Sequence, residues 1–392
     1  VAVRDASGTI LWSWHIWATH YIWDGSADLT ATTSKEGVDG PTSVAFAPCN
    51  LGFCEPRKGN DARKFRVRFV FTLPDGKNTT KNVDVEGEFT QPEIVASMAG
   101  DNTYYQWGRK EPMLPGIYNK EVRDAADGRS DTQFNMIDKP YYVDYEEYKF
   151  RQQDNMNALG EPIGATIGEA IKGPYIFFKH NMKSEEGEES YFRRHWHSGE
   201  GRTPNGLKTI MNYWNSQLDQ ISTAGTAAAP NGFTVTKTIY DPCPAGYHIP
   251  APNAFAAFGP KAGSTKFSEI NSPYKIENVF DPENKYRIGW KLFLNETDGG
   301  PEIFFPATGL RDMGLNTESK QKPPFPEGRD KDTTWPAFAD VTFVATTGFA
   351  HSDGTESYQS LLFYLDNRNS GSINISVSTN NAYGFTVRPV HD

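Results

Sequence analysis

Short runs in which apolar residues occupy every second position, each closed by turn residues, restrict the fold of this chain most strongly. Residues 65–71 follow this pattern, Leu-Pro-Asp-Gly at 73–76 turns the chain, and apolar residues return at Val83 and Val85. A period of two is that of a strand with one buried face. The sequence predicts a β-hairpin within residues 60–95, with one apolar and one basic or polar face, added to a larger β-rich unit.

A second hairpin is predicted at the start of the chain. Residues 1–3 alternate, residues 5–8 read Asp-Ala-Ser-Gly, and residues 10–17 carry large side chains at both odd and even positions. A strand with bulky residues on both faces is typical of the interior of a sheet. We therefore expect the strand within residues 10–17 to be central in a sheet.

Only two short helices are expected. Thr166 and Glu169 have the spacing of a capping box, in which each side chain satisfies a free amide of the first turn. A second helix is predicted over residues 252–258, with Pro in its first turn and Gly-Pro after it. Further strands are predicted at residues 175–178, 290–294, 302–305, 341–345, 360–365 and 383–390.

Composition is that of an ordered, acidic, β-rich protein. The 392 residues include 39 Lys+Arg and 49 Asp+Glu, which give a formal net charge of −10, and 13% of the residues are aromatic. Such a negative balance argues against a protein that binds nucleic acid phosphates or anionic membranes. The many aromatic, Gly and Pro residues exclude a disordered or coiled-coil chain.

The beginning of the chain shows neither a signal peptide nor a membrane segment. The apolar runs are all shorter than the roughly 18 residues that a transmembrane helix needs. The chain starts on Val1 without Met, in what reads as a strand already under way. We expect residues 1–392 to form one large C-terminal module of a longer protein with domains upstream.

Several motifs in order resemble a known group of surface proteins. They are residues 10–17 (ILWSWHIW), 50–52 (NLG), 104–109 (YYQWGR), 241–250 (DPCPAGYHIP), 305–309 (FPATG) and 384–390 (GFTVRPV). Together they resemble the Fibrobacter succinogenes major paralogous domain and the C-terminal regions of fimbrillin-like proteins of Bacteroidetes. The resemblance implies an extracellular protein of the bacterial surface, in the outer membrane or a fimbria.

The resemblance also implies a fold. The turn that leads through residues 249–250 into a short helix is similar to a corner of the C-type-lectin-like fold, which formylglycine-generating enzymes share. The expected class is therefore α+β: a twisted mixed sheet, two short helices and long ordered loops. The chemistry of those enzymes needs a reactive cysteine pair late in the chain, whereas Cys243 is the only cysteine after Cys54.

The three cysteines leave three arrangements open. Cys49 and Cys243 lie in Pro-flanked motifs, and in an oxidising compartment a structural disulfide between them would join the early strands to the second helix. A bridge between Cys49 and Cys54, and buried free thiols, are the alternatives. Related domains often carry a cysteine in the last strand, where this chain has Pro389.

The expected ligand-binding residues lie in the segment Arg193, Arg194, His195, Trp196 and His197. Two histidines two positions apart on a strand face the same side, but no third ligand at a recognisable spacing completes a metal site. Aromatic and Arg side chains dominate binding hot spots, so Trp196 with its basic neighbours is the predicted contact surface for a sugar or protein. An exposed aromatic and basic loop without function is the alternative.

Other aromatic motifs favour structural roles. Trp107 is expected in the core, Gly108 at a tight backbone approach, and Arg109 as a brace for a loop, although a carbohydrate platform is the alternative. Trp12, Trp14, Trp17 and Trp23 are likewise expected to pack in the core or at its edge.

Motifs for catalysis are missing. The nucleophile elbow, the zinc-protease helix, the P-loop and the dinucleotide fingerprint do not occur, and no cofactor or metal is predicted. The sequence predicts a non-enzymatic adhesin or fimbrial-tip-like module that binds a glycan or protein partner. The alternatives are a structural subunit of a surface or pilus assembly, with strand exchange at the open edge by Val1, and a glycan-processing enzyme with distant carboxylates such as Asp312 and Asp340.

Overall fold

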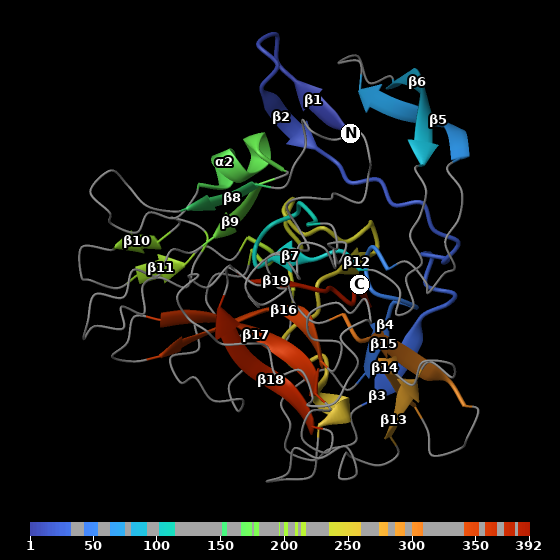
Figure 1. Cartoon of the computed structure of the whole chain (residues 1–392), viewed down its shortest axis with the longest axis vertical. Helices are drawn as coiled ribbons and strands as arrows, with labels where there is room; N and C mark the ends of the chain where they lie inside the picture. The colour runs from blue at the N-terminus through green and yellow to red at the C-terminus, as the bar shows by residue number, and fades with distance from the viewer. Residues whose placement is uncertain are drawn as a thin grey trace, which may run out of the picture.

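The computed structural model is β-rich and nearly free of helix (Figure 1). It describes residues 1–32, 43–53, 63–74, 80–91, 102–113, 151–154, 166–174, 176–179, 196, 200–202, 208–210, 213–216, 235–259, 274–280, 287–294, 300–308, 341–352, 357–366, 372–380 and 383–392. Within these residues there are one six-residue α-helix, one three-residue 3-10 helix and twenty strands. The predicted β-rich class is confirmed. Across this described part, no helix is long and apolar enough to cross a bilayer.

The last strand of the chain joins two early strands in a four-stranded sheet. Its order is β12-β20-β4-β3, with β3 at Leu29–Thr32, β4 at Ser43–Phe46, β12 at Tyr247–His248 and β20 at Val390–His391. Val390 lies opposite both Phe46 and His248, so the last strand runs between an early strand and a central one. The sheet therefore closes the fold only after the whole chain has been assembled.

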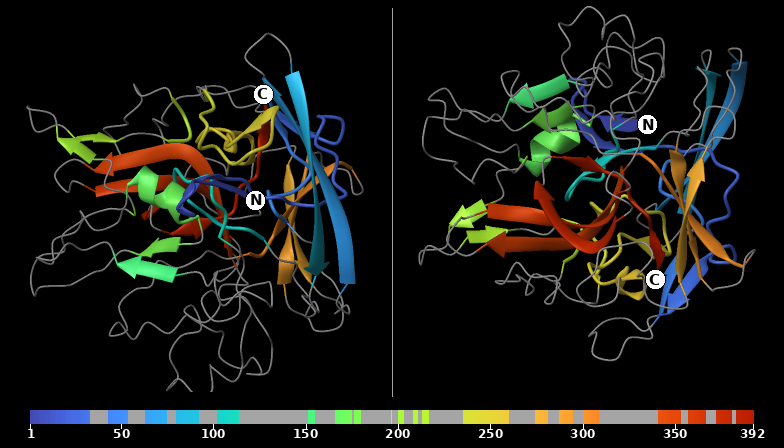
Figure 2. Two further views of the ribbon diagram at one scale, coloured as in Figure 1. Left: turned by 90° about the horizontal axis from the view of Figure 1, so that it is seen from above. Right: turned by 60° about the horizontal axis from the view of Figure 1, so that its bottom comes forward.

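Two three-stranded antiparallel sheets enclose the largest apolar core. One contains β13 (Lys275–Phe280), β14 (Arg287–Phe293) and β15 (Glu302–Pro306), and the other contains β16 (Val341–Ser352), β17 (Ser357–Asp366) and β18 (Ser372–Asn380). Figure 2 shows these two sheets on opposite sides of the segment that carries the 3-10 helix η3 (Ala256–Phe258). Phe255 of that segment stacks on Phe363 with ring centroids 4.3 Å apart, so η3 fills the space between the sheets.

Three further strand pairs are short. They are β7 (Tyr105–Gln106) with β19 (Gly384–Phe385), β8 (Arg151–Asp154) with β9 (Ile176–Lys179), and β10 (Glu200–Arg202) with β11 (Lys208–Ile210). Strands β8 and β9 are parallel, and an isolated parallel bridge joins Val344 of β16 to Thr386. The expectation of one large mixed sheet is thus wrong for this part of the chain, because its strands divide among eight separate sheets.

Helix α2 (Ile167–Lys172) forms where its cap was predicted. Thr166 Oγ1 accepts from the Glu169 amide at 3.1 Å, and the Glu169 carboxylate accepts from the Thr166 amide at 2.7 Å. Both bonds satisfy amides that the first turn leaves free. The second predicted helix is shorter than expected, since residues 252–255 form turns and only η3 is helical.

Two hairpins stand apart from these sheets at the top of Figure 1. Strands β5 (Arg63–Pro74) and β6 (Thr80–Gln91) pair along their whole length, which confirms the hairpin predicted within residues 60–95. Strands β1 (Ala2–Arg4) and β2 (Ile10–Ser13) form the other. The prediction that this second strand is central in a sheet is wrong, because β2 pairs only with β1 among the described strands and Leu11 is 52% exposed.

Other predicted strands are found with shifted ends. Strands β15, β16 and β17 cover their predicted positions, and β9 and β14 overlap theirs, whereas residues 383–390 contain two short strands, β19 and β20, instead of one. The buried segment between them includes Arg388, whose side chain donates to the Ala47 carbonyl.

The tightest backbone contact in the described sheets predicts an overpacking test. A Cβ on Gly289 of β14 would lie 2.4 Å from the Phe305 carbonyl oxygen on β15, so Gly289→Ala should destabilise the protein by about 1–3 kcal/mol. The matched control is Gly168→Ala in α2, where the nearest atom to an added Cβ is 3.8 Å away. Urea unfolding should show the control unchanged or up to about 1 kcal/mol more stable. Equal effects of the two changes would contradict the packing described.

Candidate functional site

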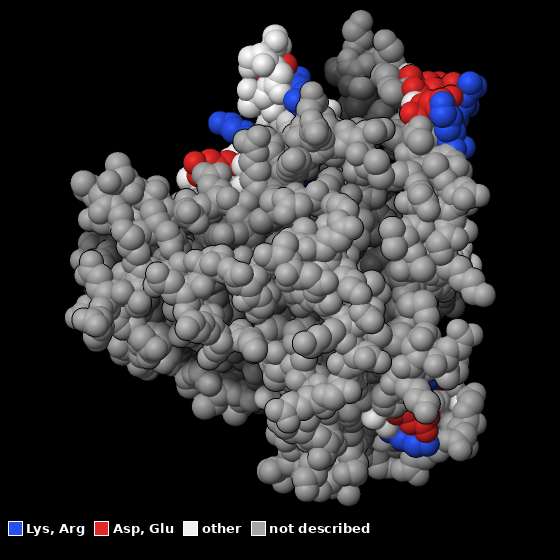
Figure 3. All heavy atoms as spheres, in the orientation of Figure 1, with Lys and Arg blue, Asp and Glu red and all other residues white. Residues whose placement is uncertain are grey.

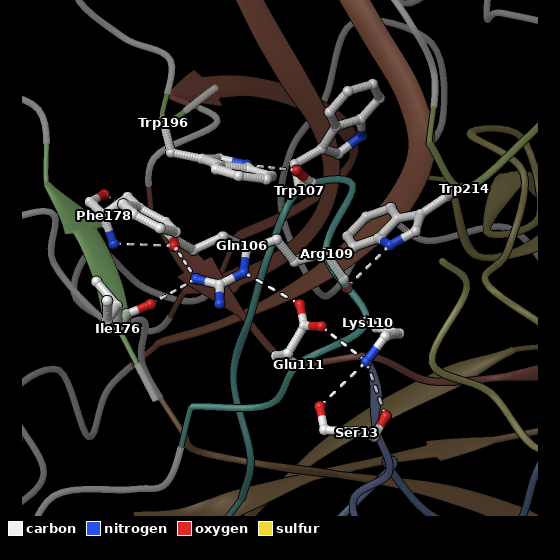
Figure 4. Close-up of polar contacts among 10 residues, drawn as sticks. All are labelled: Ser13, Gln106, Trp107, Arg109, Lys110, Glu111, Ile176, Phe178, Trp196 and Trp214. Atoms are coloured by element: carbon white, nitrogen blue, oxygen red, sulfur yellow. Dashed lines mark hydrogen bonds and ion pairs between the residues drawn. The ribbon is translucent and has the colours of Figure 1, made fainter. Parts of the chain in front are cut away.

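The most distinctive site is a buried polar cluster built on the segment after β7. Arg109 is completely buried, and its Nη1 donates to the Ile176 carbonyl at 2.6 Å and to Gln106 Oε1 at 3.0 Å (Figure 4). Its guanidinium carbon lies 5.0 Å from the Phe178 ring centroid and 5.5 Å from that of Trp196. The arrangement confirms Arg109 as a brace, because it ties the turn after β7 to strand β9.

Gln106 completes the link to the same strand. Its Nε2 donates to the Phe178 carbonyl at 2.9 Å, and its Oε1 accepts from the Phe178 amide at 3.2 Å. One side chain thereby pairs with both backbone groups of a residue, as a neighbouring strand would do. Trp107 is also fully buried, and Gly108 has a φ of 84°, a conformation that favours glycine.

Carboxylate and ammonium groups connect this cluster to the N-terminal hairpin. Glu111 Oε2 lies 3.4 Å from Arg109 Nε, while its Oε1 lies 2.8 Å from Lys110 Nζ. Lys110 Nζ also donates to the Ser13 carbonyl at 2.8 Å and lies 4.3 Å from the Trp12 ring centroid. The hairpin is therefore fixed to the interior through a nearly buried lysine.

Arg388 makes an equivalent cluster near the end of the chain. This fully buried side chain donates to Asn50 Oδ1 at 2.7 Å, to the Ala47 carbonyl at 3.1 Å and to the Phe304 carbonyl. Burial lowers the pKa of its guanidinium to about 10, which leaves it protonated at neutral pH. The charge is thus compensated by oxygens from two distant segments.

The 241–250 motif is held by buried polar groups of its own. Asp241 accepts from the amides of Cys243 at 2.7 Å and Ile249 at 2.9 Å. Lys237 Nζ donates to three carbonyls of this segment, those of Cys243, Pro244 and Tyr247, at 2.6–2.8 Å. Burial raises the pKa of the Asp241 carboxyl, against the opposing effect of these amide bonds. These contacts fix the shape of a loop that has almost no regular secondary structure.

Geometry excludes these clusters from contact with a ligand. Arg109, Gln106 and Arg388 are completely buried, and each donates to at least one backbone carbonyl of the same chain. A catalytic or binding group must reach its substrate. No group of three or more His, Cys, Asp or Glu in the described ranges has the arrangement of a metal site. The chemistry of these residues is structural: they convert irregular loops into a rigid body.

Trp196 lies inside the protein, which corrects its predicted role as an exposed contact. It is completely buried, stacks on Phe178 at 5.7 Å between ring centroids, and donates its Nε1–H to the Trp107 carbonyl at 2.7 Å. An aromatic residue flanked by basic ones gives no sign of burial, so the sequence pattern was misleading. The other predicted contact residues, Arg193, Arg194, His195 and His197, lie outside the described residues, as do Asp312 and Asp340.

No disulfide joins Cys49 to Cys243, although both are buried. The predicted bridge between them is therefore wrong in this structure, and Cys54 lies outside the described residues. Burial, followed by the nearby Asp241 carboxylate, raises the pKa of the Cys243 thiol well above its usual value. Cys243 is thus neutral and packs as a small apolar side chain.

The accessible candidate is a surface that the sequence did not reveal. We define the N-terminal apolar surface as Val1, Val3 and Trp14, which are each between 47% and 52% exposed; Leu11 and Ile16 of the same segment are exposed to a similar extent. Val1 lies opposite Trp14 and Val3 opposite Trp12, so these four share one face of the hairpin. Trp14 was expected in the core or at its edge, and its exposure corrects that prediction.

Comparison with known proteins places the chain in no established group: no family model, curated protein or solved structure matches it. The resemblance to fimbrillin-like surface proteins stays a prediction from the motifs.

The Arg109 cluster predicts strong energetic coupling. Replacing Arg109 by Met should destabilise the protein by about 3–5 kcal/mol, because it leaves the Glu111 carboxylate buried beside Lys110 alone and two acceptors unpaired. Adding Glu111→Gln should recover part of that loss. A double-mutant cycle by urea unfolding measures the coupling, for which we expect at least about 1 kcal/mol. Purely additive losses would contradict a shared buried cluster.

Proposed function

We propose that this chain is a non-enzymatic module of the bacterial cell surface, an adhesin or fimbrial-tip-like domain that binds a protein or glycan. Its support from the sequence is the ordered set of surface-protein motifs, and the C-type-lectin-like arrangement belongs to the same proposal. Its support from the structure is that the motifs form a rigid interior from which an apolar surface projects. Binding sites are commonly carried by segments that a rigid scaffold positions.

The exposure of Trp14 is the observation on which the proposal depends. Trp107, Trp196, Trp214 and Trp290 are completely buried, whereas Trp14 is 47% exposed on a two-stranded hairpin. Half-exposed Val1 lies opposite it across the hairpin, and half-exposed Val3 lies on the same face. Clusters of exposed apolar side chains on a surface are typical of interaction sites, and Trp is the residue most enriched in hot spots.

The chemistry of this surface suits a partner with a flat apolar patch beside polar groups. An indole presents a flat face to a sugar ring or to an apolar side chain. Lys110, which is bonded to Ser13 on the same hairpin, restricts the motion of β2 relative to the interior. The contact surface would then lose little conformational freedom on binding.

Replacing Trp14 by Ala should abolish most of the binding without unfolding the protein. We expect affinity for adherent cells or for the retained glycan on an array to fall about thirtyfold, which corresponds to about 2 kcal/mol. The control is Val70→Ala, which removes a similarly exposed side chain (54%) from the other hairpin. Unchanged thermal unfolding with lost adherence would support the proposal, and unchanged adherence of Trp14→Ala would contradict it.

The alternative function is a structural subunit of a surface or pilus assembly, and the outer edge of β1, which pairs with no other described strand than β2, favours it. Val1 and Trp14 exchange both backbone hydrogen bonds, so Ala2 directs its amide and carbonyl away from β2. Such an edge can accept a strand from another subunit. Electron micrographs distinguish the two functions, since an adhesin lies at a filament end and a structural subunit repeats along it. Turnover of a glycan by the purified protein would overturn both.

A further inference from the structure

The β5–β6 hairpin carries a second interaction surface. Its strands pair over twelve residues each, from Arg63 opposite Gln91 to Pro74 opposite Thr80, and neither pairs with another strand among the described residues. Every second residue of each strand therefore directs its backbone groups toward the outside. Long unpaired edges are templates for strand addition unless they are blocked.

Charges on one face of the hairpin are separated by strand. The basic residues Lys64, Arg66 and Arg68 occupy alternate positions of β5, and the acidic residues Asp84, Glu86 and Glu88 occupy alternate positions of β6. Figure 3 shows them as adjoining blue and red atoms at the upper right of the molecule. We call the two rows the basic stripe and the acidic stripe.

Stability of the hairpin alone does not account for the stripes. Within one chain the charges pair at 3.1–3.7 Å, through Lys64–Glu88, Arg66–Glu88 and Arg68–Asp84. The side chains of these five residues are 49–81% exposed, and exposed pairs of this kind contribute little. Mixing the signs within each strand would give the same number of pairs. Because the signs are sorted by strand, the β5 edge presents basic side chains to a partner and the β6 edge presents acidic ones.

The sorting selects one mode of pairing between copies. Two β5 edges would place basic residues opposite basic residues, and two β6 edges would place acidic residues opposite acidic ones, which is unfavourable. A β5 edge beside the β6 edge of another copy places opposite charges side by side. We propose that copies of this chain associate through their hairpins, with β6 of one copy pairing with β5 of the next.

The geometry of this contact makes it open-ended. Strand β6 of the second copy would lie antiparallel to β5 of the first, about 4.7–4.9 Å away, which extends the order β6-β5-β6-β5 across copies. Each copy uses one edge and offers the other, so the contact is heterologous and forms chains instead of closed dimers. The opposite face of the hairpin would become continuous as well, with half-buried Val67 and Phe69 at its centre.

Cross-linking of two variants that each carry one introduced cysteine beside the three native ones tests the pairing. Arg66 and Glu88 lie directly opposite each other within one hairpin, so the same register between copies brings position 66 of one beside position 88 of the next. An equimolar mixture of Arg66→Cys and Glu88→Cys is treated with a short bis-maleimide, and linked peptides are identified by mass. We expect links between the two introduced thiols about tenfold more often than links between identical positions.

A variant with exchanged stripes provides the matched control. Its basic stripe is made acidic and its acidic stripe is made basic, except that position 88 again carries the introduced cysteine. The substitutions are Lys64→Glu, Arg66→Glu, Arg68→Glu, Asp84→Lys, Glu86→Lys and Glu88→Cys. Inside its own hairpin, positions 68 and 84 still carry opposite charges, and the pairs through position 88 are lost as they are in Glu88→Cys. Its basic β6 should no longer link to the Arg66→Cys protein, and the yield should fall to that of identical positions. Unchanged thermal unfolding shows that folding is intact.

Three results would overturn the proposal: no links, links mainly between identical positions, or the same yield with exchanged stripes. Association by sedimentation should also weaken between about 50 and 500 mM NaCl, because salt screens exposed charges. The surface lies on a different hairpin from Trp14, so its failure leaves the proposed binding function untouched, and loss of adherence in Trp14→Ala leaves lateral association intact.

Discussion

Two buried arginines impose the constraint on which the rest of the structure depends. A guanidinium out of contact with water is costly unless oxygens compensate its charge. Arg109 finds them on Gln106, Glu111 and the Ile176 carbonyl, and Arg388 finds them on Asn50 and on carbonyls as far as 341 positions away in sequence. The loops must therefore be in place before either charge can be buried, which couples distant parts of the chain into one body.

This rigid interior separates the structural residues from those that are free to interact. Polar side chains within the sequence motifs at residues 104–109 and 384–390 form hydrogen bonds with backbone groups of their own chain. The two hairpins present side chains outward, apolar ones on β1–β2 and sorted charges on β5–β6. The surface on β1–β2 suits a binding partner, and the surface on β5–β6 suits a second copy of the chain. The fold is therefore consistent with a module that both adheres and assembles.

Local features of the fold could be predicted from the sequence, and long-range ones could not. The β5–β6 hairpin and the Thr166 cap follow from residues close together in the chain, where alternation and spacing determine the contacts. The burial of Trp196 depends on Trp107, 89 positions earlier, and no local pattern encodes that contact. Bulky residues on both faces of residues 10–17 suggested a central strand, although Leu11, Trp14 and Ile16 are each about half exposed. The predicted Cys49–Cys243 disulfide was wrong for the same reason as the predicted exposure of Trp196: the sequence alone does not show how two distant loops are positioned.

Hydrogen exchange of the native protein tests most directly whether the motifs form one cooperative body. The amides of Ala47, Leu51 and Ala345 donate to Pro389, Val387 and Thr386 at 2.8–2.9 Å, and none of these bonds belongs to a regular strand pair. If buried arginines hold these segments together, the three amides should exchange slowly and at one common rate, set by global unfolding. Amides of the β5–β6 hairpin should exchange faster. Independent, rapid exchange of the three amides would contradict the account, because it would show loops that open without disturbing one another.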